Sequence, residues 1–146
     1  IARPELKAYG GRRQFGGRIH TVQVYQDNVL VRRQLERTVV DAVLVIDGGG
    51  SLECALVGDI LAGMACQNGW QGIVVNGCIR DAAAIATAFS TRVVMASAGQ
   101  IPRICPMTGF FSSRVMQKRS QPAGRFSLRV LGTGGLWLWI AIRSSV

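Results

Sequence analysis

The chain has 146 residues, of which 49% are hydrophobic and only 17% are charged, and its formal net charge is +9. This length and composition predict one folded domain with a buried core and exclude a disordered chain. No uninterrupted apolar run approaches the roughly 20 residues that span a bilayer, so no membrane partner is expected.

The positive charge is unevenly distributed along the chain. Residues 1–81 carry nine basic and eight acidic side chains, whereas residues 82–146 carry eight basic side chains and no acidic one. Arg12-Arg13 and Arg32-Arg33 lack interleaved aromatic residues, so these pairs are more typical of a solvated surface than of an RNA or protein contact. We therefore expect no direct binding to nucleic acid.

The cysteines do not form a zinc-binding pattern, because no two of them stand in a C-x2-C pair and the chain has a single histidine. They are Cys54, Cys66, Cys78 and Cys105. Free thiols indicate a reducing compartment, and we expect a cytoplasmic protein. The first residues form neither a signal nor a transit peptide, and the missing initial Met indicates truncation or processing.

The first third of the chain predicts a loop, two strands and one helix. Residues 9–17 contain four glycines and predict a loop. The alternating pattern from His20 to Tyr25 predicts a half-buried strand. Apolar residues at helical spacing predict a short amphipathic helix from Asn28 to Arg37. The β-branched run from Val39 to Ile46 predicts a buried strand, and Gly48 to Gly50 predict a tight turn.

Two helix starts are expected in the next segment. Ser51 is expected to cap a short helix that ends before Gly58. Asp59 is expected to cap a second helix that runs to about Asn68. One continuous helix that tolerates Gly58 is the alternative.

A further strand and helix follow. Residues 72–75 predict a buried strand, Gly77 is expected to turn the chain, and residues 82–88 predict a short helix. This alternation of strands, turns and helices indicates an α/β fold. Residues 97–135 show no sustained periodicity, so no element is predicted there.

Asp59, Arg80 and Asp81 are the strongest candidates for a functional site. They form the pattern D-x20-R-D, and each lies near a glycine. Carboxylates are hard oxygen ligands that suit Mg2+ or Mn2+, and an arginine can grip an oxyacid through two hydrogen bonds. If Asp59 begins a helix, the amides of Ile60 and Leu61 can hold a substrate carboxylate. A metal ion here would polarise a 2-oxo group and stabilise an enolate.

Structural roles remain open for the same residues. Asp59 can serve only as a helix cap, and Arg80 and Asp81 only as a solvated ion pair. Residues 43–51 (VLVIDGGGS) have a phosphate-binding loop as an alternative interpretation, but they match neither G-x-G-x-x-G nor a Walker A sequence, so close packing explains their glycines better. His20 lies in a strand pattern and is expected to be structural.

From Tyr9 to about Ile85 the chain resembles the family that contains the regulator of ribonuclease activity A and the class II 4-hydroxy-4-methyl-2-oxoglutarate aldolases. The matching stretches are YGGRRQFGGRIHTVQVYQDNVLV, VLVIDGGGSLECALVGDILA and NGWQGIVVNGCIRDAAAI. The first is similar to the regulator, and the last two carry the aldolase signature D-x20-R-D. The resemblance implies a swivelling β/β/α sandwich that assembles as a trimer or a trimer-based oligomer, with sites at subunit interfaces.

The resemblance also implies roles for the candidate residues. Arg80 would bind the pyruvate part of the substrate and stabilise the enolate, while Gly58 and the amides of Ile60 and Leu61 would hold the carboxylate. Asp81 would bind Mg2+ or Mn2+, and Asp59 would bind that ion directly or orient its water. The implied reaction is cleavage of a 4-hydroxy-2-oxo acid to pyruvate, with decarboxylation of oxaloacetate through the same enolate.

The alternative that the family implies is a non-catalytic trimeric regulator that binds and inhibits ribonuclease E or an associated RNA helicase. Some members of the regulator subgroup lack the final aspartate of the motif, whereas this chain keeps Asp81, which favours catalysis. Other members carry the name demethylmenaquinone methyltransferase, which we discount because the sequence contains no convincing S-adenosylmethionine site.

The tail after about Phe89 does not resemble the family, whose tails contain a P-G-D turn and an acidic D-x-D-G strand. We therefore divide the single domain into a family-like core, residues 1–88, and an atypical tail, residues 89–146. In a shifted reading frame from Val130 onward, with free synonymous choice, the tail can spell P-G-D-x-x-x-V-A-V-D-R-D-S-I-V, and Trp139-Ile140 forces one of these aspartates. A frameshift is our hypothesis for the tail, and a divergent natural tail is the alternative.

Overall fold

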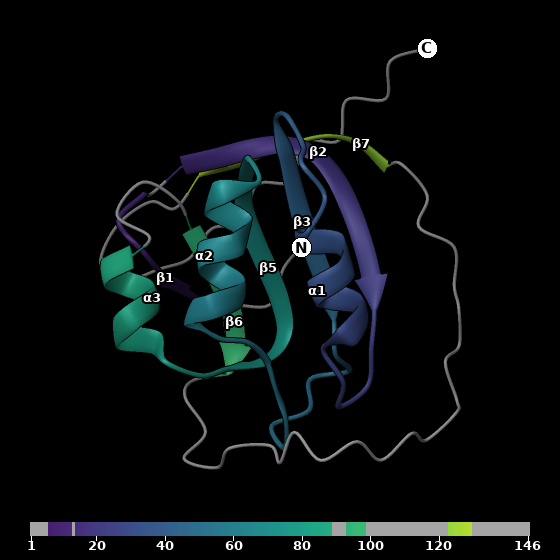
Figure 1. The fold of residues 1–146 in the computed structure, drawn as a ribbon, viewed down its shortest axis with the longest axis vertical. Coiled ribbons are helices and arrows are strands. Elements are labelled where there is room, and N and C mark those ends of the chain that lie inside the picture. The colour runs from purple at the N-terminus through teal and green to yellow at the C-terminus, as the bar shows by residue number, and fades with distance from the viewer. Residues whose placement is uncertain (1–5, 13, 89–92, 99–122, 130–146) are drawn as a thin grey trace.

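The computed structural model describes residues 6–12, 14–88, 93–98 and 123–129. Its strands are β1 (Lys7–Tyr9), β2 (Gln14–Gln23), β3 (Ala42–Asp47), β4 (Ala55–Val57), β5 (Trp70–Ile79), β6 (Val93–Ala98) and β7 (Ala123–Arg129), and its helices are α1 (Val29–Leu35), α2 (Asp59–Gln67) and α3 (Ala82–Ala88). The sheet has the strand order β1-β6-β5-β3-β2-β7, and β4 pairs with β5 off this path. Figure 1 shows this arrangement.

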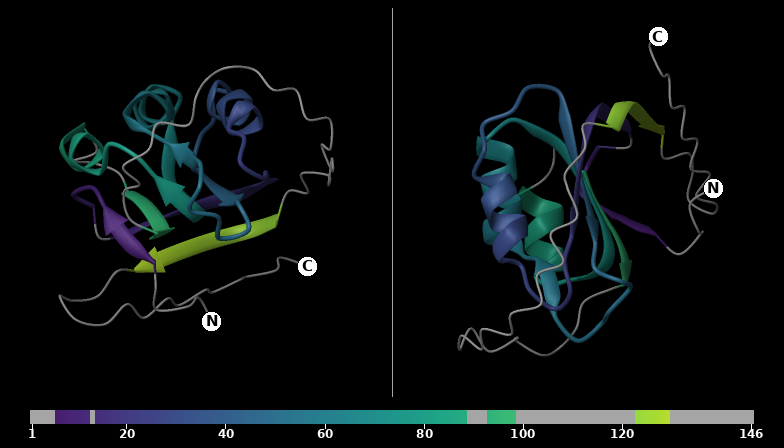
Figure 2. Two further views of the ribbon diagram at one scale, coloured as in Figure 1. Left: turned by 90° about the horizontal axis from the view of Figure 1, so that it is seen from below. Right: turned by 90° about the vertical axis from the view of Figure 1, so that its right-hand side faces the viewer.

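The centre of the sheet is parallel and its edges are antiparallel. Strands β2, β3, β5 and β6 pair in parallel, whereas β1 and β7 pair antiparallel with β6 and β2. The three helices lie side by side on one face of the sheet (Figure 2). Helices are the usual crossover connections between parallel strands, and here they cover the apolar face. The predicted α/β class is confirmed.

The core lies between this helical layer and the sheet. Val31 and Leu35, one helical turn apart on α1, are fully buried, as the predicted amphipathic pattern requires. They pack with Leu44 and Ile46 of β3 and Ile73 of β5 in one hydrophobic cluster. Burying a side chain such as Leu35 contributes about 1.5–3 kcal/mol. No helix among the described residues is long and apolar enough to cross a membrane.

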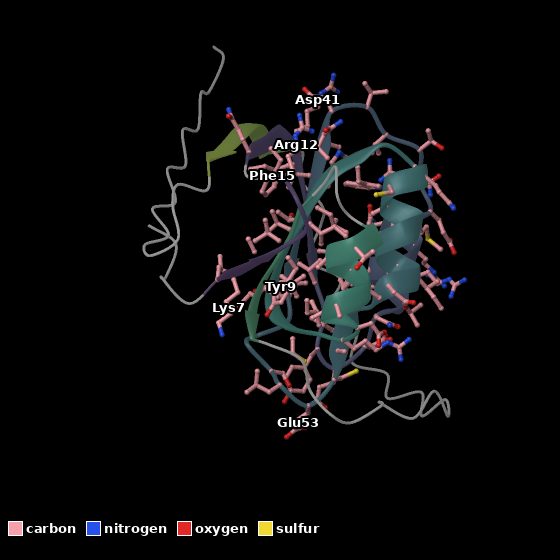
Figure 3. The ribbon with its side chains drawn as sticks, turned by 90° about the vertical axis from the view of Figure 1, so that its left-hand side faces the viewer. Lys7, Tyr9, Arg12, Phe15, Asp41 and Glu53 are labelled. Carbon is pink, nitrogen blue, oxygen red and sulfur yellow. The ribbon has the colours of Figure 1, made fainter. Side chains whose placement is uncertain are left out.

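The predicted loop at residues 9–17 is wrong in its second half, because β2 begins at Gln14. The side chain of Phe15 is buried, and its ring covers Gly72 of β5 so closely that a Cβ at Gly72 would lie 2.5 Å from ring atom Cδ2. Arg12 donates to Gln71 Oε1 at 3.3 Å, and Figure 3 labels Arg12 and Phe15 toward the same end of the molecule. Strand β2 therefore extends into the glycine-rich sequence, because its residues contact β5 and pair with β3 and β7.

The predicted helix that starts at Ser51 is also wrong, and so is the continuous helix through Gly58. The Ser51 hydroxyl accepts a hydrogen bond from the Glu53 amide at 3.3 Å, which closes a turn and caps no helix. Residues 55–57 then form β4, all three of them buried beside β5. Pairing with β5 therefore overrides the helical spacing of this segment.

The predicted turn at Gly77 is likewise wrong, because β5 continues through it to Ile79. Leu56 of β4 packs over this glycine, and a Cβ at Gly77 would lie 3.1 Å from Leu56 Cδ1. Gly77 thus provides space for β4 and does not turn the chain. The frameshift hypothesis concerns the tail, residues 89–146, of which the structure describes β6 and β7, and the shifted reading from Val130 onward lies outside the described residues.

Candidate metal and oxyacid site

The pairing of β4 with β5 brings the two halves of the D-x20-R-D pattern together. Ala55 pairs with Cys78 and Val57 with Ile79, so that the next residues, Gly58 and Arg80, lie in contact at the carboxyl ends of both strands. The Arg80 amide donates to the Val57 carbonyl at 3.0 Å and fixes this alignment. The carboxyl edge of the strands is where open α/β sheets bind ligands.

Arg80 and Asp81 form an ion pair. Arg80 Nε lies 3.2 Å from Asp81 Oδ2, and the two side chains are 35% and 42% exposed. Exposed pairs of this kind contribute at most about 1 kcal/mol to folding. Among the described residues, the terminal nitrogens of Arg80 have no hydrogen-bond partner, so they can receive an oxyacid.

The Arg80–Asp81 ion pair packs against the backbone of Gly58. A Cβ at Gly58 would lie 2.7 Å from Arg80 Nε, 3.1 Å from Arg80 Cγ and 3.2 Å from Asp81 Oδ2. Its backbone, with φ −126° and ψ −174°, is one that any residue can adopt. Space beside Arg80, and not backbone freedom, is therefore the reason for a glycine here.

Asp81 has a left-handed backbone conformation, with φ +57°. Aspartate tolerates this conformation better than most residues, at a cost on the order of 1 kcal/mol. Its carbonyl accepts a hydrogen bond from the Ile85 amide at 2.9 Å, so it directly precedes α3. Asp81 is thus held between the end of β5 and the start of α3, next to Arg80.

The prediction that Asp59 caps α2 is wrong by one residue. Gly58, with its extended backbone, is the N-cap, and Asp59 is the first residue of the helix. Asp59 Oδ1 accepts a hydrogen bond from the Ile60 amide at 2.7 Å. In this arrangement the Ile60 amide is occupied by Asp59, and the Leu61 amide, in the first helical turn, is the remaining donor of the predicted pair.

The acidic side chains suit a cation that keeps most of its water. The described residues contain no group of three or more His, Cys, Asp or Glu side chains that could hold a metal ion. The site therefore offers at most the two carboxylates of Asp59 and Asp81, both of them accessible to solvent. Mg2+ binds proteins through one or two carboxylates and retains several waters, whereas structural zinc needs four protein ligands. This donor set fits Mg2+ or Mn2+.

The glycine turn after β3 is occupied by internal hydrogen bonds. The Gly49 amide donates to Asp47 Oδ1 at 3.0 Å, and the Gly48 and Gly50 amides donate to the Asn76 carbonyl at 2.8 and 3.3 Å. These amides do not point to an open phosphate site, so the phosphate-loop alternative is not supported. Asn76 Nδ2 also donates to Asp47 Oδ1 at 2.9 Å.

This Asp47–Asn76 contact was not predicted from the sequence. Both residues follow buried apolar stretches, and they face each other on the neighbouring strands β3 and β5. A polar residue at the end of each of two adjacent parallel strands is the signal that could have found it.

Comparison with known proteins identifies close relatives of this sequence. A family model described as "RraA-like: Aldolase/RraA" matches residues 2–109. A protein of Arabidopsis thaliana, named as a proposed 4-hydroxy-4-methyl-2-oxoglutarate aldolase 3, is 62% identical over 78 residues, which are 53% of this chain and 47% of that protein. One from Aromatoleum aromaticum with a similar proposed name is 54% identical over 87 residues, 60% of this chain and 55% of that protein. The chain thus spans about half the length of these curated relatives.

Two solved structures share the fold. The RNA-processing inhibitor RraA from Thermus thermophilus superposes with a TM-score of 0.62 at 42% identity, over 66% of this chain and 57% of that one. A protein of Geobacillus kaustophilus named as an S-adenosylmethionine: 2-dimethylmenaquinone methyltransferase gives a TM-score of 0.64 at 40% identity, over 90% of this chain and 71% of that one. Their names assign different functions to one fold, so function has to be argued from the site.

The family match extends beyond the resemblance described above, which ended at about Ile85 and left out the tail after about Phe89. It reaches residue 109, and β6 at residues 93–98 pairs with β5 inside the sheet. The predicted fold type is confirmed by the RraA structure, and the predicted family by the model that covers residues 2–109. This chain belongs to the RraA-like family, Aldolase/RraA.

Proposed function

We propose that this chain is a divalent-metal-dependent lyase that releases pyruvate from 4-hydroxy-2-oxo acids, including 4-hydroxy-4-methyl-2-oxoglutarate, and from oxaloacetate. The observation that carries the proposal is the Arg80–Asp81 ion pair, which packs against Gly58 at the carboxyl edge of the sheet. The aldolase names of relatives that are 62% and 54% identical support it.

Each residue has a role that follows from its position. Asp81, with Asp59 beside the same glycine, would hold Mg2+ or Mn2+, which acts as a Lewis acid on a 2-oxo group. The terminal nitrogens of Arg80 and the Leu61 amide would bind the carboxylate of the 2-oxo acid. Cleavage of the C3–C4 bond leaves its electron pair in the enolate of pyruvate, which Arg80 stabilises by its charge. In the 4-hydroxy acid, the C4 hydroxyl loses its proton to solvent and C4 leaves as the carbonyl carbon of the second product, whereas in oxaloacetate C4 leaves as CO2. In both cases a proton taken up from solvent at C3 converts the enolate to pyruvate.

The direct test is pyruvate release from oxaloacetate and from 4-hydroxy-4-methyl-2-oxoglutarate, measured with Mg2+, with Mn2+ and with EDTA. We expect turnover only with added metal, and we expect its loss in Arg80→Ala and Asp81→Ala. Metal-independent turnover, or turnover that survives both substitutions, would contradict the assignment of these residues.

A second function, inhibition of an RNA-processing enzyme through protein contact, is favoured by the 42% identity to the RNA-processing inhibitor RraA. In this case ribonuclease E or an associated RNA helicase would be the partner. Inhibition of purified ribonuclease E by a folded sample that releases no pyruvate would support it. Because protein contact needs neither the guanidinium nor the metal ligand, this inhibition is expected to survive both alanine substitutions.

We also propose an oligomeric state and a cellular compartment for this chain. We infer a trimer or a trimer-based oligomer with sites at its interfaces, supported by the exposed apolar side chains of Tyr25, Leu52 and Ile60 at the carboxyl edge of the sheet. Light scattering after gel filtration measures this mass directly. Cys54, Cys66 and Cys78 form no disulfide among the described residues, which supports our expectation of a cytoplasmic protein.

A further inference from the structure

We propose that Arg80 couples the two ligands of this site: its ion pair with Asp81 opposes cation binding until an oxyacid occupies the guanidinium. This inference rests on the proposed cation and oxyacid site. It adds an order to the binding events, in which the cation binds tightly only when the oxyacid is present.

The positively charged guanidinium of Arg80 lies beside the Asp81 carboxylate, which is the group that would bind the cation. Arg80 Nε lies 3.2 Å from Asp81 Oδ2, so a cation that approaches this carboxylate also approaches the guanidinium. The cation and the guanidinium carry like charges and repel each other at close range, and with only 35% and 42% of the Arg80 and Asp81 side chains exposed, water screens this repulsion incompletely. The guanidinium of Arg80 therefore weakens cation binding at Asp81.

An oxyacid can remove this opposition because the ion pair uses a single nitrogen. The terminal nitrogens of Arg80 have no partner among the described residues, so a carboxylate can bind there while Nε keeps its place. The negative charge of the oxyacid then offsets the guanidinium, and cation affinity rises. By thermodynamic linkage, the cation increases the affinity for the oxyacid by the same factor.

The fold allows this charge to be removed without loss of the strand pairing. The backbone of Arg80 is held by its amide, which donates to the Val57 carbonyl at 3.0 Å, and by the pairing of β4 with β5. A substitution at Arg80 leaves these backbone contacts in place and increases the space around Gly58. Loss of the side chain is therefore expected to change binding more than stability.

The test is the affinity for Mn2+ alone, measured by electron paramagnetic resonance of free Mn2+, for the wild type and Arg80→Gln. We expect Arg80→Gln to bind Mn2+ at least about fivefold more tightly than the wild type, in line with typical coupling factors. A structural role for Arg80 predicts the opposite sign, because a damaged site binds less metal. With pyruvate present, the wild type is expected to gain Mn2+ affinity by more than the variant does.

Arg32→Gln is the matched control. Arg32 Nε lies 3.2 Å from Glu36 Oε1 on α1, so its substitution removes the same charge and the same kind of ion pair away from the site. We expect wild-type Mn2+ affinity for Arg32→Gln, and also for Arg80→Lys, which keeps the positive charge. Arg80→Met, another neutral side chain, provides the same test if the glutamine variant does not fold.

The outcomes separate this inference from the proposed function. Mn2+ affinity in Arg80→Gln that equals or falls below that of the wild type would overturn the coupling. If the wild type still releases pyruvate with metal in that case, the lyase proposal stands and only the coupling is lost. If Mn2+ binding does not depend on Asp81 and no pyruvate forms, both are refuted.

Discussion

The Cα of Gly58 lies against the side chain of Arg80, so that a Cβ at residue 58 would be 2.7 Å from Nε. Gly58→Ala is expected to push the guanidinium out of its place and to separate it from Asp81. Displacement of a substrate-positioning group by about 1 Å can cost up to roughly 100-fold in rate. We therefore expect pyruvate release to fall by about tenfold to 100-fold.

Gly63→Ala is the control for this glycine substitution. Gly63 lies in the same helix that Gly58 caps, and a Cβ there would meet nothing within 4 Å. Alanine in a helix is favoured over glycine by about 0.5–1 kcal/mol, so this variant is expected to be more stable and fully active. Equal activity of both variants would show that Gly58 does not position Arg80.

Asp81→Asn tests the role of the negative charge at residue 81 while the left-handed backbone conformation is kept. Asparagine tolerates the left-handed conformation as aspartate does, so the variant is expected to fold while losing metal-dependent turnover. Asp41 has a similar φ of +54°. It lies away from the candidate site, because Figure 3 shows it at the opposite end of the molecule from Glu53, which shortly precedes β4 and Gly58. Asp41→Asn is thus the matched control, with thermal unfolding and pyruvate release as the measurements. Loss of turnover in both would indicate a general structural effect.

His20 gives the folded state a pH dependence. Burial lowers its pKa, and the guanidinium groups of Arg37 and Arg18 lower it further. The ring packs edge-on against Trp70, with centroids 5.3 Å apart. Above the usual histidine pKa of about 6.5, His20 is neutral in both states and its contribution to stability is complete. As the pH falls through this value towards the lowered pKa, the unfolded chain takes up a proton that the folded chain resists, and stability is lost.

Urea unfolding at about pH 7.5 and about pH 5.5 measures this loss, since the two values lie on either side of the usual histidine pKa. We expect the free energy of unfolding to fall between them, and we expect a smaller fall in His20→Gln. The same fall in both proteins would assign the pH dependence to other groups.

Cysteine reactivity is expected to differ between Cys66 and Cys78. Cys78 is buried, and burial raises the pKa of its thiol, whereas Cys66 is half-buried. The thiolate is the reactive form, so iodoacetamide is expected to modify native Cys66 at least about tenfold faster than Cys78. Peptide mass mapping follows each cysteine separately. Equal rates would indicate that β5 opens locally before reaction.

The sequence by itself determined the elements whose hydrophobic pattern is local and regular. The helical spacing of Val31 and Leu35 predicted α1, and the apolar runs before Asp47 and Asn76 predicted β3 and the four central residues 72–75 of β5. It also supplied the residue types of the site, because carboxylates and a guanidinium carry the same chemistry wherever the fold places them.

Only the tertiary structure decided how these residues meet. The three residues of β4 are too few to distinguish a strand from a helix by periodicity, and the segment is a strand because it pairs with β5 and is buried there. This pairing sets Gly58 against Arg80, a steric relationship that no sequence spacing reveals. The hydrogen bond that occupies the Ile60 amide depends likewise on the side-chain conformation of Asp59. Local pattern thus identified the chemical groups, and long-range strand pairing brought Gly58 into contact with Arg80 and Asp81.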